Sequence, residues 1–131
     1  MITRLFLGLQ VLLFIPYGIY CLVQPAAMAA GAGLSITSVT GSIEIQTMYG
    51  GLQVAVGALC LLGVMRQAFE NTALTALLFI FAGLAVVRVS LGVLYGDFSN
   101  YTLFAMIYEA SCLLFLLWCL VWRRPAAEMP A

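Results

Sequence analysis

The chain has 131 residues, of which 65% are apolar and only 8% are charged. Soluble domains carry about 45–50% apolar and about 25% charged residues, so this composition excludes a water-soluble globular protein. Five basic and five acidic residues give a net charge of zero, which excludes the basic surface that nucleic-acid binding needs. The sequence has no histidine, so histidine-ligated metal or haem sites and Ser-His-Asp catalysis are excluded as well.

Four stretches are long and apolar enough to cross a membrane as helices, since a spanning helix needs about 20 such residues. They cover residues 5–23, 43–65, 73–95 and 101–122. Turn-forming residues lie between them, including Asn71 and Thr72 before the third stretch. We therefore predict an all-α fold, an integral membrane four-helix bundle that forms one transmembrane domain over residues 1–131.

The arginines outside the apolar stretches predict the orientation of the chain. Arg4, Arg66, Arg123 and Arg124 flank the ends of these stretches, whereas the segments 24–42 and 96–100 contain no basic residue. Basic residues accumulate on the cytoplasmic side of membrane proteins. Both termini are therefore expected in the cytoplasm.

A cleaved signal peptide is an alternative interpretation of the first stretch. Arg4, the apolar run and the triplet Ala27-Met28-Ala29 imitate the three regions of such a peptide. The run covers residues 5–23, however, and this exceeds the apolar region of about 7–15 residues that signal peptides have. Its length favours a spanning helix.

Arg88 and Glu109 lie inside the third and fourth stretches. An ionised residue at the bilayer centre costs about 2.5–3.5 kcal/mol, so it normally faces protein and finds a partner. At the helical rise per residue, Glu109 lies roughly 21 Å and Arg88 roughly 24 Å from the inner surface. Because consecutive helices are antiparallel, we predict that these two residues pair.

The second stretch brings further polar groups to a similar height. Residues at helical spacing form a polar and small-residue stripe that is expected to face the bundle, made up of Gln46, Tyr49, Gly50, Gln53 and Gly57. Gly50 and Gly51 would let another backbone or a ligand approach closely. Glu44 points in another direction, near the outer interface, and Tyr17 in the first stretch can reach the same layer.

These residues together predict an outward-facing polar pocket. Arg88 and Glu109 would form its floor, and Tyr49, Gln53, Tyr17 and Glu44 its walls. The alternative is an ion pair that only fixes the helix register. Because a buried ion pair is a weak stabilising device, intramembrane charges favour a functional role.

Two other sets of residues are expected to be structural. The four cysteines have no metal-ligand spacing, and we expect buried free thiols. Glu70 is expected to pair with Arg66 in the loop before the third helix.

The segment Glu44-Ile45-Gln46-Thr47-Met48-Tyr49-Gly50-Gly51-Leu52 resembles the DUF4345 family of small bacterial membrane proteins. The resemblance extends to Pro25, Arg88 and Glu109, and so covers nearly the whole chain. It implies a four-helix multi-pass protein of the bacterial inner membrane and no particular activity. Gln46 stands where relatives often carry arginine.

The first functional hypothesis is a small-ligand-binding or accessory membrane subunit. Its pocket would hold a lipid-like or quinone-like molecule, with Arg88 at an anionic or carbonyl group and Glu109 holding the guanidinium. The alternative is a minimal proton-coupled transporter or channel, acting as a dimer and titrating Glu109 or Glu44. An enzyme is disfavoured because no nucleophile–base pair is recognisable, and no cofactor is expected. Membrane lipids and a homodimer or larger membrane complex are the expected partners.

Overall fold

The computed structural model describes residues 1–122, and every regular element among them is helical. Four helices are long and apolar enough to cross a membrane: Ile2–Val23, Val39–Met65, Gln67–Tyr95 and Asn100–Leu120. The prediction of an all-α chain with four helices long and apolar enough to span a membrane is confirmed for the described residues. Arg123 and Arg124, which contribute to the predicted orientation, lie outside the described residues.

The elements follow one another with short connections. In chain order they are α1 (Ile2–Val23), α2 (Pro25–Gly31), α3 (Val39–Ile45), the π-helix η1 (Gln46–Gly51), α4 (Leu52–Met65), α5 (Gln67–Tyr95), α6 (Asn100–Leu117) and the π-helix η2 (Trp118–Trp122). Contacts divide the chain into two compact units, Met1–Ala73 and Leu74–Ala131, with the boundary inside α5. Each unit is described by itself.

The third spanning helix begins earlier than predicted. Arg66 alone is extended, with φ −129° and ψ 118°, and it separates α4 from α5. Asn71 and Thr72 therefore lie inside α5 and do not form a turn. Glu70 lies in the first turn of α5, where a carboxylate interacts favourably with the helix dipole.

Glu70 also has a different partner from the predicted Arg66. Its carboxylate accepts a hydrogen bond from the Thr3 hydroxyl and one from Arg4 Nε at 3.0 Å. The prediction that Glu70 pairs with Arg66 is wrong. Since α5 begins at Gln67, Glu70 is part of a helix and is directed to the start of α1.

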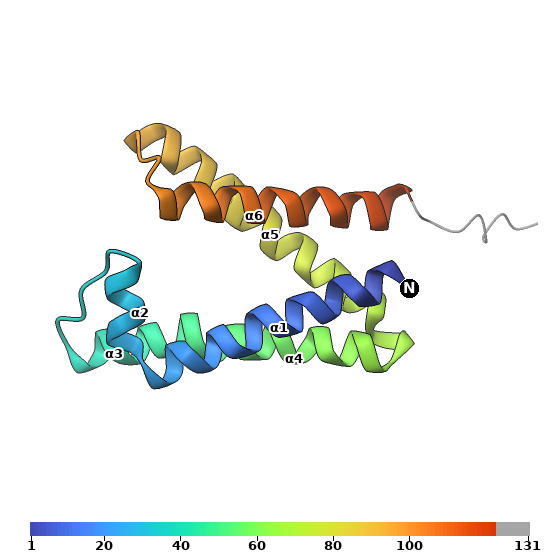
Figure 1. Cartoon of the computed structure of the whole chain (residues 1–131), viewed down its shortest axis with the longest axis horizontal. Helices are drawn as coiled ribbons and strands as arrows, with labels where there is room; N and C mark the ends of the chain where they lie inside the picture. Colours follow the sequence, from blue (N-terminus) through green and yellow to red (C-terminus); the bar gives the residue numbers. More distant parts are fainter. Residues whose placement is uncertain (123–131) are drawn as a thin grey trace, which may run out of the picture. The chain divides into compact units, whose positions relative to one another are not determined.

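In the first unit α1 lies side by side with the helix formed by η1 and α4 (Figure 1). Glycines permit a close approach of the two backbones. A Cβ at Gly18 would lie 2.9 Å from Gly50 O and 2.9 Å from Val54 N, and one at Gly57 would lie 2.5 Å from Ile15 Cγ1. Small residues at such contacts are typical of helix pairs in membranes.

A π turn interrupts the second spanning helix over Gln46–Gly51, where the N–H of Leu52 donates to Thr47 O, five residues back. A π turn advances each residue by less than the roughly 100° of an α-helix, so side-chain directions differ from the predicted ones. Gly50 and Gly57 are buried as expected, and Gln46 Nε2 donates to Leu22 O of α1 at 3.0 Å. Tyr49 is 37% exposed, and for Tyr49 the expectation that this stripe faces the bundle stays a prediction.

In the second unit α5 and α6 run antiparallel (Figure 1). Residues three or four positions apart form a buried stripe on each helix, with Leu77, Phe81 and Ala85 in α5 and Cys112 and Leu116 in α6. The Phe81 and Tyr108 rings meet edge to face, with 5.5 Å between their centroids. Arg88 continues the stripe of α5, and Glu109 continues that of α6, so the packing of the two helices brings both charges together.

The α1–α4 contact predicts opposite effects for two Gly→Ala changes in α1. Gly18→Ala should destabilise the protein by about 1–3 kcal/mol, because the new methyl group meets backbone atoms that cannot move aside. At Gly8 no atom lies within 4 Å of the added Cβ, so Gly8→Ala should be neutral or should stabilise the helix by about 0.5–1 kcal/mol. Thermal unfolding of both variants in one detergent measures the difference, and equal stability would contradict this packing.

Candidate functional site

Arg88 in α5 and Glu109 in α6 form a close ion pair. Arg88 Nε lies 2.9 Å from Glu109 Oε1 and 3.0 Å from Oε2, and Arg88 Nη2 lies 2.8 Å from Oε1. The contact uses one edge of the guanidinium, the arrangement that gives charge-assisted hydrogen bonds their direction and strength. The predicted pairing of these residues at one height is confirmed.

The two partners differ in exposure. The Glu109 side chain is 5% exposed and the Arg88 side chain is 30% exposed. The Glu109 side chain is therefore shielded, while the Arg88 side chain is partly accessible. Glu109 acts as the buried counterion that orients Arg88, and Arg88 is the group that a ligand could meet.

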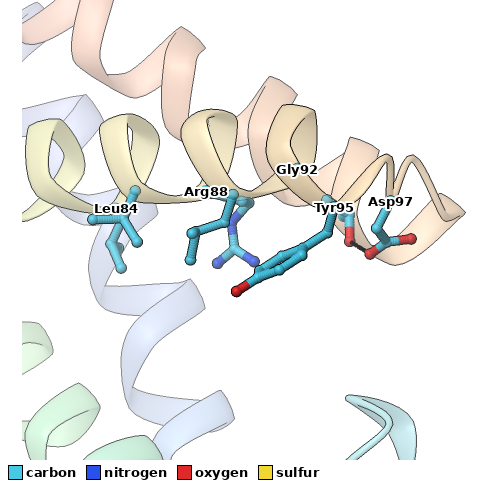
Figure 2. A pocket seen from close by; sticks show the side chains of 8 residues that line it. Leu84, Arg88, Gly92, Tyr95 and Asp97 are labelled. Atoms are coloured by element: carbon cyan, nitrogen blue, oxygen red, sulfur yellow. Dashed lines mark hydrogen bonds between the residues drawn. The ribbon is translucent and has the colours of Figure 1, made fainter.

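Arg88 lines a cleft of about 280 Å³ that lies wholly within the second unit. The other lining residues are Leu84, Val87, Leu91, Gly92, Tyr95, Asp97 and Thr102. Leu84, Val87 and Leu91 make one part of it apolar, and Tyr95 and Asp97 bring polar groups to the part where α5 ends. In Figure 2 the Tyr95 ring extends back along α5 toward the Arg88 guanidinium.

The turn between α5 and α6 fixes the polar part of the cleft. Gly96 has a φ of 66° and the N–H of Asp97 donates to Gly92 O at 3.1 Å, which is a typical helix C-cap. Asp97 Oδ2 accepts from the Thr102 hydroxyl at 2.8 Å, and Asp97 Oδ1 accepts from the N–H of Ser99 at 3.1 Å. These hydrogen bonds, that from Thr102 first, hold the pKa of Asp97 below its ordinary value. The carboxylate therefore stays ionised.

The remaining predicted site residues belong to the first unit. Tyr17 is 39% exposed and Tyr49 is 37% exposed, Glu44 is also exposed, and Gln53 is partly buried. A common pocket of these residues with Arg88 and Glu109 stays a prediction. In the part of the chain that the structure describes, no group of three or more His, Cys, Asp or Glu side chains could hold a metal ion, and all four cysteines are buried free thiols.

Sequence reasoning missed the part of the cleft at the end of α5. In the predicted arrangement Tyr95 ends the stretch 73–95, Asp97 belongs to the connecting segment 96–100, and Thr102 lies at the start of the stretch 101–122. One signal was available, because the spacing from Ser99 to Thr102 is that of a helix N-cap and its first turn. That pattern fixes Thr102 beside the turn, within reach of Asp97.

The chain matches a known protein family. The model of the family described as "Domain of unknown function (DUF4345)" covers residues 2–120. No curated protein matches the chain, and no solved structure does.

Removal of only one partner of the ion pair should destabilise the protein strongly. Arg88→Gln leaves the shielded Glu109 carboxylate without its cation and should cost about 3 kcal/mol, as for other buried pairs. The double variant Arg88→Gln/Glu109→Gln has no orphan charge and should recover most of that loss. Unfolding of both single variants and the double variant in one detergent measures the coupling. Additive losses would show that the two residues do not interact.

The turn predicts an acid-sensitive contribution to stability. Folding lowers the pKa of Asp97, so the ionised carboxylate stabilises the folded protein. This stabilisation is complete when the pH is above the pKa of an ordinary aspartate, about 4, and it is lost as the pH falls through the lowered pKa of the folded protein. Thermal unfolding of wild type and Asp97→Asn should therefore differ at about pH 6 and converge toward about pH 2. A difference that does not change with pH would contradict this role of the carboxylate.

Proposed function

This chain belongs to the DUF4345 family, and from that premise we propose that it is a membrane protein that binds the head group of a lipid-like or quinone-like molecule beside Arg88. The observation that carries the proposal is the partly exposed Arg88 side chain, which lines a cleft with apolar walls and is paired with the buried carboxylate of Glu109.

The ion pair prepares Arg88 for binding. Glu109 fixes the direction of the guanidinium, so a ligand does not have to immobilise a long flexible side chain, and this lowers the entropic cost of binding. An anionic or carbonyl group can accept hydrogen bonds from a guanidinium in this position. Apolar residues of similar size stabilise a helix pair as well as a buried ion pair does. A binding role therefore explains a partly exposed ion pair better than stability alone.

The size and lining of the cleft favour a head group with a tail that lies outside it. The volume of about 280 Å³ is just below the roughly 300–1,000 Å³ of pockets that enclose a whole drug-sized ligand. Leu84, Val87 and Leu91 are 42%, 57% and 43% exposed. Their side chains would carry the apolar part of the molecule onward along α5 into the surrounding lipid.

We place the protein in the inner membrane of a bacterium, with both termini in the cytoplasm. Arg4 in the first turn of α1 and Arg66 between α4 and α5 support this orientation. Arg88 precedes the end of α5 at Tyr95 by seven residues, or roughly 10 Å of helix. In this orientation the cleft faces the outer leaflet.

A proton-coupled transporter or channel is the second candidate, with Glu109 as the titrating group. Both carboxylate oxygens of Glu109 already accept hydrogen bonds from Arg88. The ion-pair geometry therefore favours ligand binding over proton transport. A homodimer or an accessory role in a larger complex is compatible with either function.

Binding is tested by mass spectrometry of molecules retained after purification in a mild detergent. Wild type should retain an amphiphile that Arg88→Gln/Glu109→Gln loses by roughly tenfold or more, the effect of losing a charge-assisted contact of about 1.5–3 kcal/mol. The matched control is Arg4→Gln/Glu70→Gln, which removes the other described ion pair and should leave retention unchanged. Equal retention by wild type and both double variants would overturn the proposal.

A further inference from the structure

The polar and apolar groups of the cleft follow a fixed order along α5. In chain order Leu84 and Val87 come first, Arg88 follows, and Tyr95 and Asp97 lie at the end of the helix. Figure 2 shows this order for Leu84, Arg88, Tyr95 and Asp97. A ligand that matches this order has an apolar tail, then an anionic or carbonyl group, then a group that suits a carboxylate and an aromatic ring. A carboxylate and an aromatic ring both attract cations, so the third group of the ligand is expected to be a cation.

The charges of the cleft disfavour a simple anion. Glu109 neutralises Arg88, and Asp97 adds a second carboxylate, so the three ionised groups sum to one negative charge. Nearby like charges repel, and this effect is strongest where water is scarce. A head group with only negative charge would be attracted by Arg88 and repelled by Asp97, whereas a zwitterion would be attracted by both residues.

Tyr95 and Asp97 are both placed to meet a cation. Tyr95 is 76% exposed and lines the cleft together with Asp97, and in Figure 2 its ring points from the end of α5 toward Arg88. Aromatic faces attract ammonium groups, and the attraction increases where the cation is partly desolvated. Asp97 is held by Thr102 and Ser99 in a fixed position, so its carboxylate is preorganised in the same way as the guanidinium.

We propose that the ligand is a zwitterionic membrane phospholipid, with its phosphate at Arg88 and its ammonium between Tyr95 and Asp97. This inference rests on the proposed lipid-binding function and specifies its ligand class. The acyl chains lie along Leu84 and Val87. In the orientation proposed above, the ammonium is nearest to the outer surface, as it is in a bilayer.

The test is a competition between two phospholipids with identical acyl chains, phosphatidylethanolamine and phosphatidylglycerol, which differ in the ammonium group. Purified protein is incorporated into nanodiscs that contain equal amounts of both lipids, and the retained lipid is identified by native mass spectrometry after release. Wild type should be enriched in phosphatidylethanolamine by roughly threefold or more, as expected for a partly exposed charge contact together with a cation–π contact.

Two single variants separate the contribution of the charge from that of the turn. Asp97→Asn should reduce the enrichment to nearly one while the total amount of retained lipid changes little, because the contact of the phosphate with Arg88 remains. Asn100→Ala removes an exposed side chain beside the same turn but leaves the Asp97 carboxylate and its hydrogen bonds, and it should keep the enrichment. Loss of enrichment in both variants alike would assign the effect to the turn and overturn the proposed role of Asp97.

The remaining outcomes distinguish the two proposals. If wild type retains both lipids equally or prefers phosphatidylglycerol, and retention still depends on Arg88 and Glu109, the zwitterion inference fails while the proposed function stands. If retention of neither lipid depends on Arg88 and Glu109, the zwitterion inference fails, and the proposed function stands only for a quinone-like molecule. Enrichment in phosphatidylethanolamine that requires Asp97 as well as the ion pair supports both.

Discussion

The hydrogen-bonded ion pair between Arg88 and Glu109 determines how the second unit is built. Each residue lies far inside an apolar helix, and each needs the other because hydrocarbon offers no alternative partner. Their contact sets the register of α5 against α6. In the same register Phe81, seven residues before Arg88, meets Tyr108, one residue before Glu109, edge to face. Since only one edge of the guanidinium is used for Glu109, the same contact positions Arg88 at the cleft.

The pair could be predicted from the sequence because it depends only on regular geometry. Two straight α-helices joined by a short turn place residues at equal distances from that turn at equal heights. The direction of Tyr49 depends instead on the π turn at Gln46–Gly51, which no simple pattern of apolar residues reveals. The prediction for Glu70 is wrong for a related reason. A single extended residue, Arg66, separates α4 from α5, so Glu70 lies in a helix and not in the predicted loop.

The cleft could not be predicted because it combines a helix with the turn that follows it. Leu84, Arg88 and Tyr95 share α5, but Asp97 reaches the same space only because Gly96 adopts a positive φ. That conformation reverses the chain within a few residues and brings Thr102 of α6 to the carboxylate. Gly92 contributes as well, because the absence of a Cβ there leaves room for the Met106 side chain of α6. Such contacts depend on local backbone angles and not on the periodicity of the sequence.

The apolar flank on which the cleft lies determines how any occupant arrives. A molecule with an acyl tail stays dissolved in the membrane and reaches Leu84 and Val87 by sideways diffusion within one leaflet, without passing through water. The supply of this molecule is set by its fraction among the lipids of that leaflet. Because lipids are concentrated there, a modest affinity is sufficient for high occupancy. Occupancy of the site would accordingly report the local composition of the membrane.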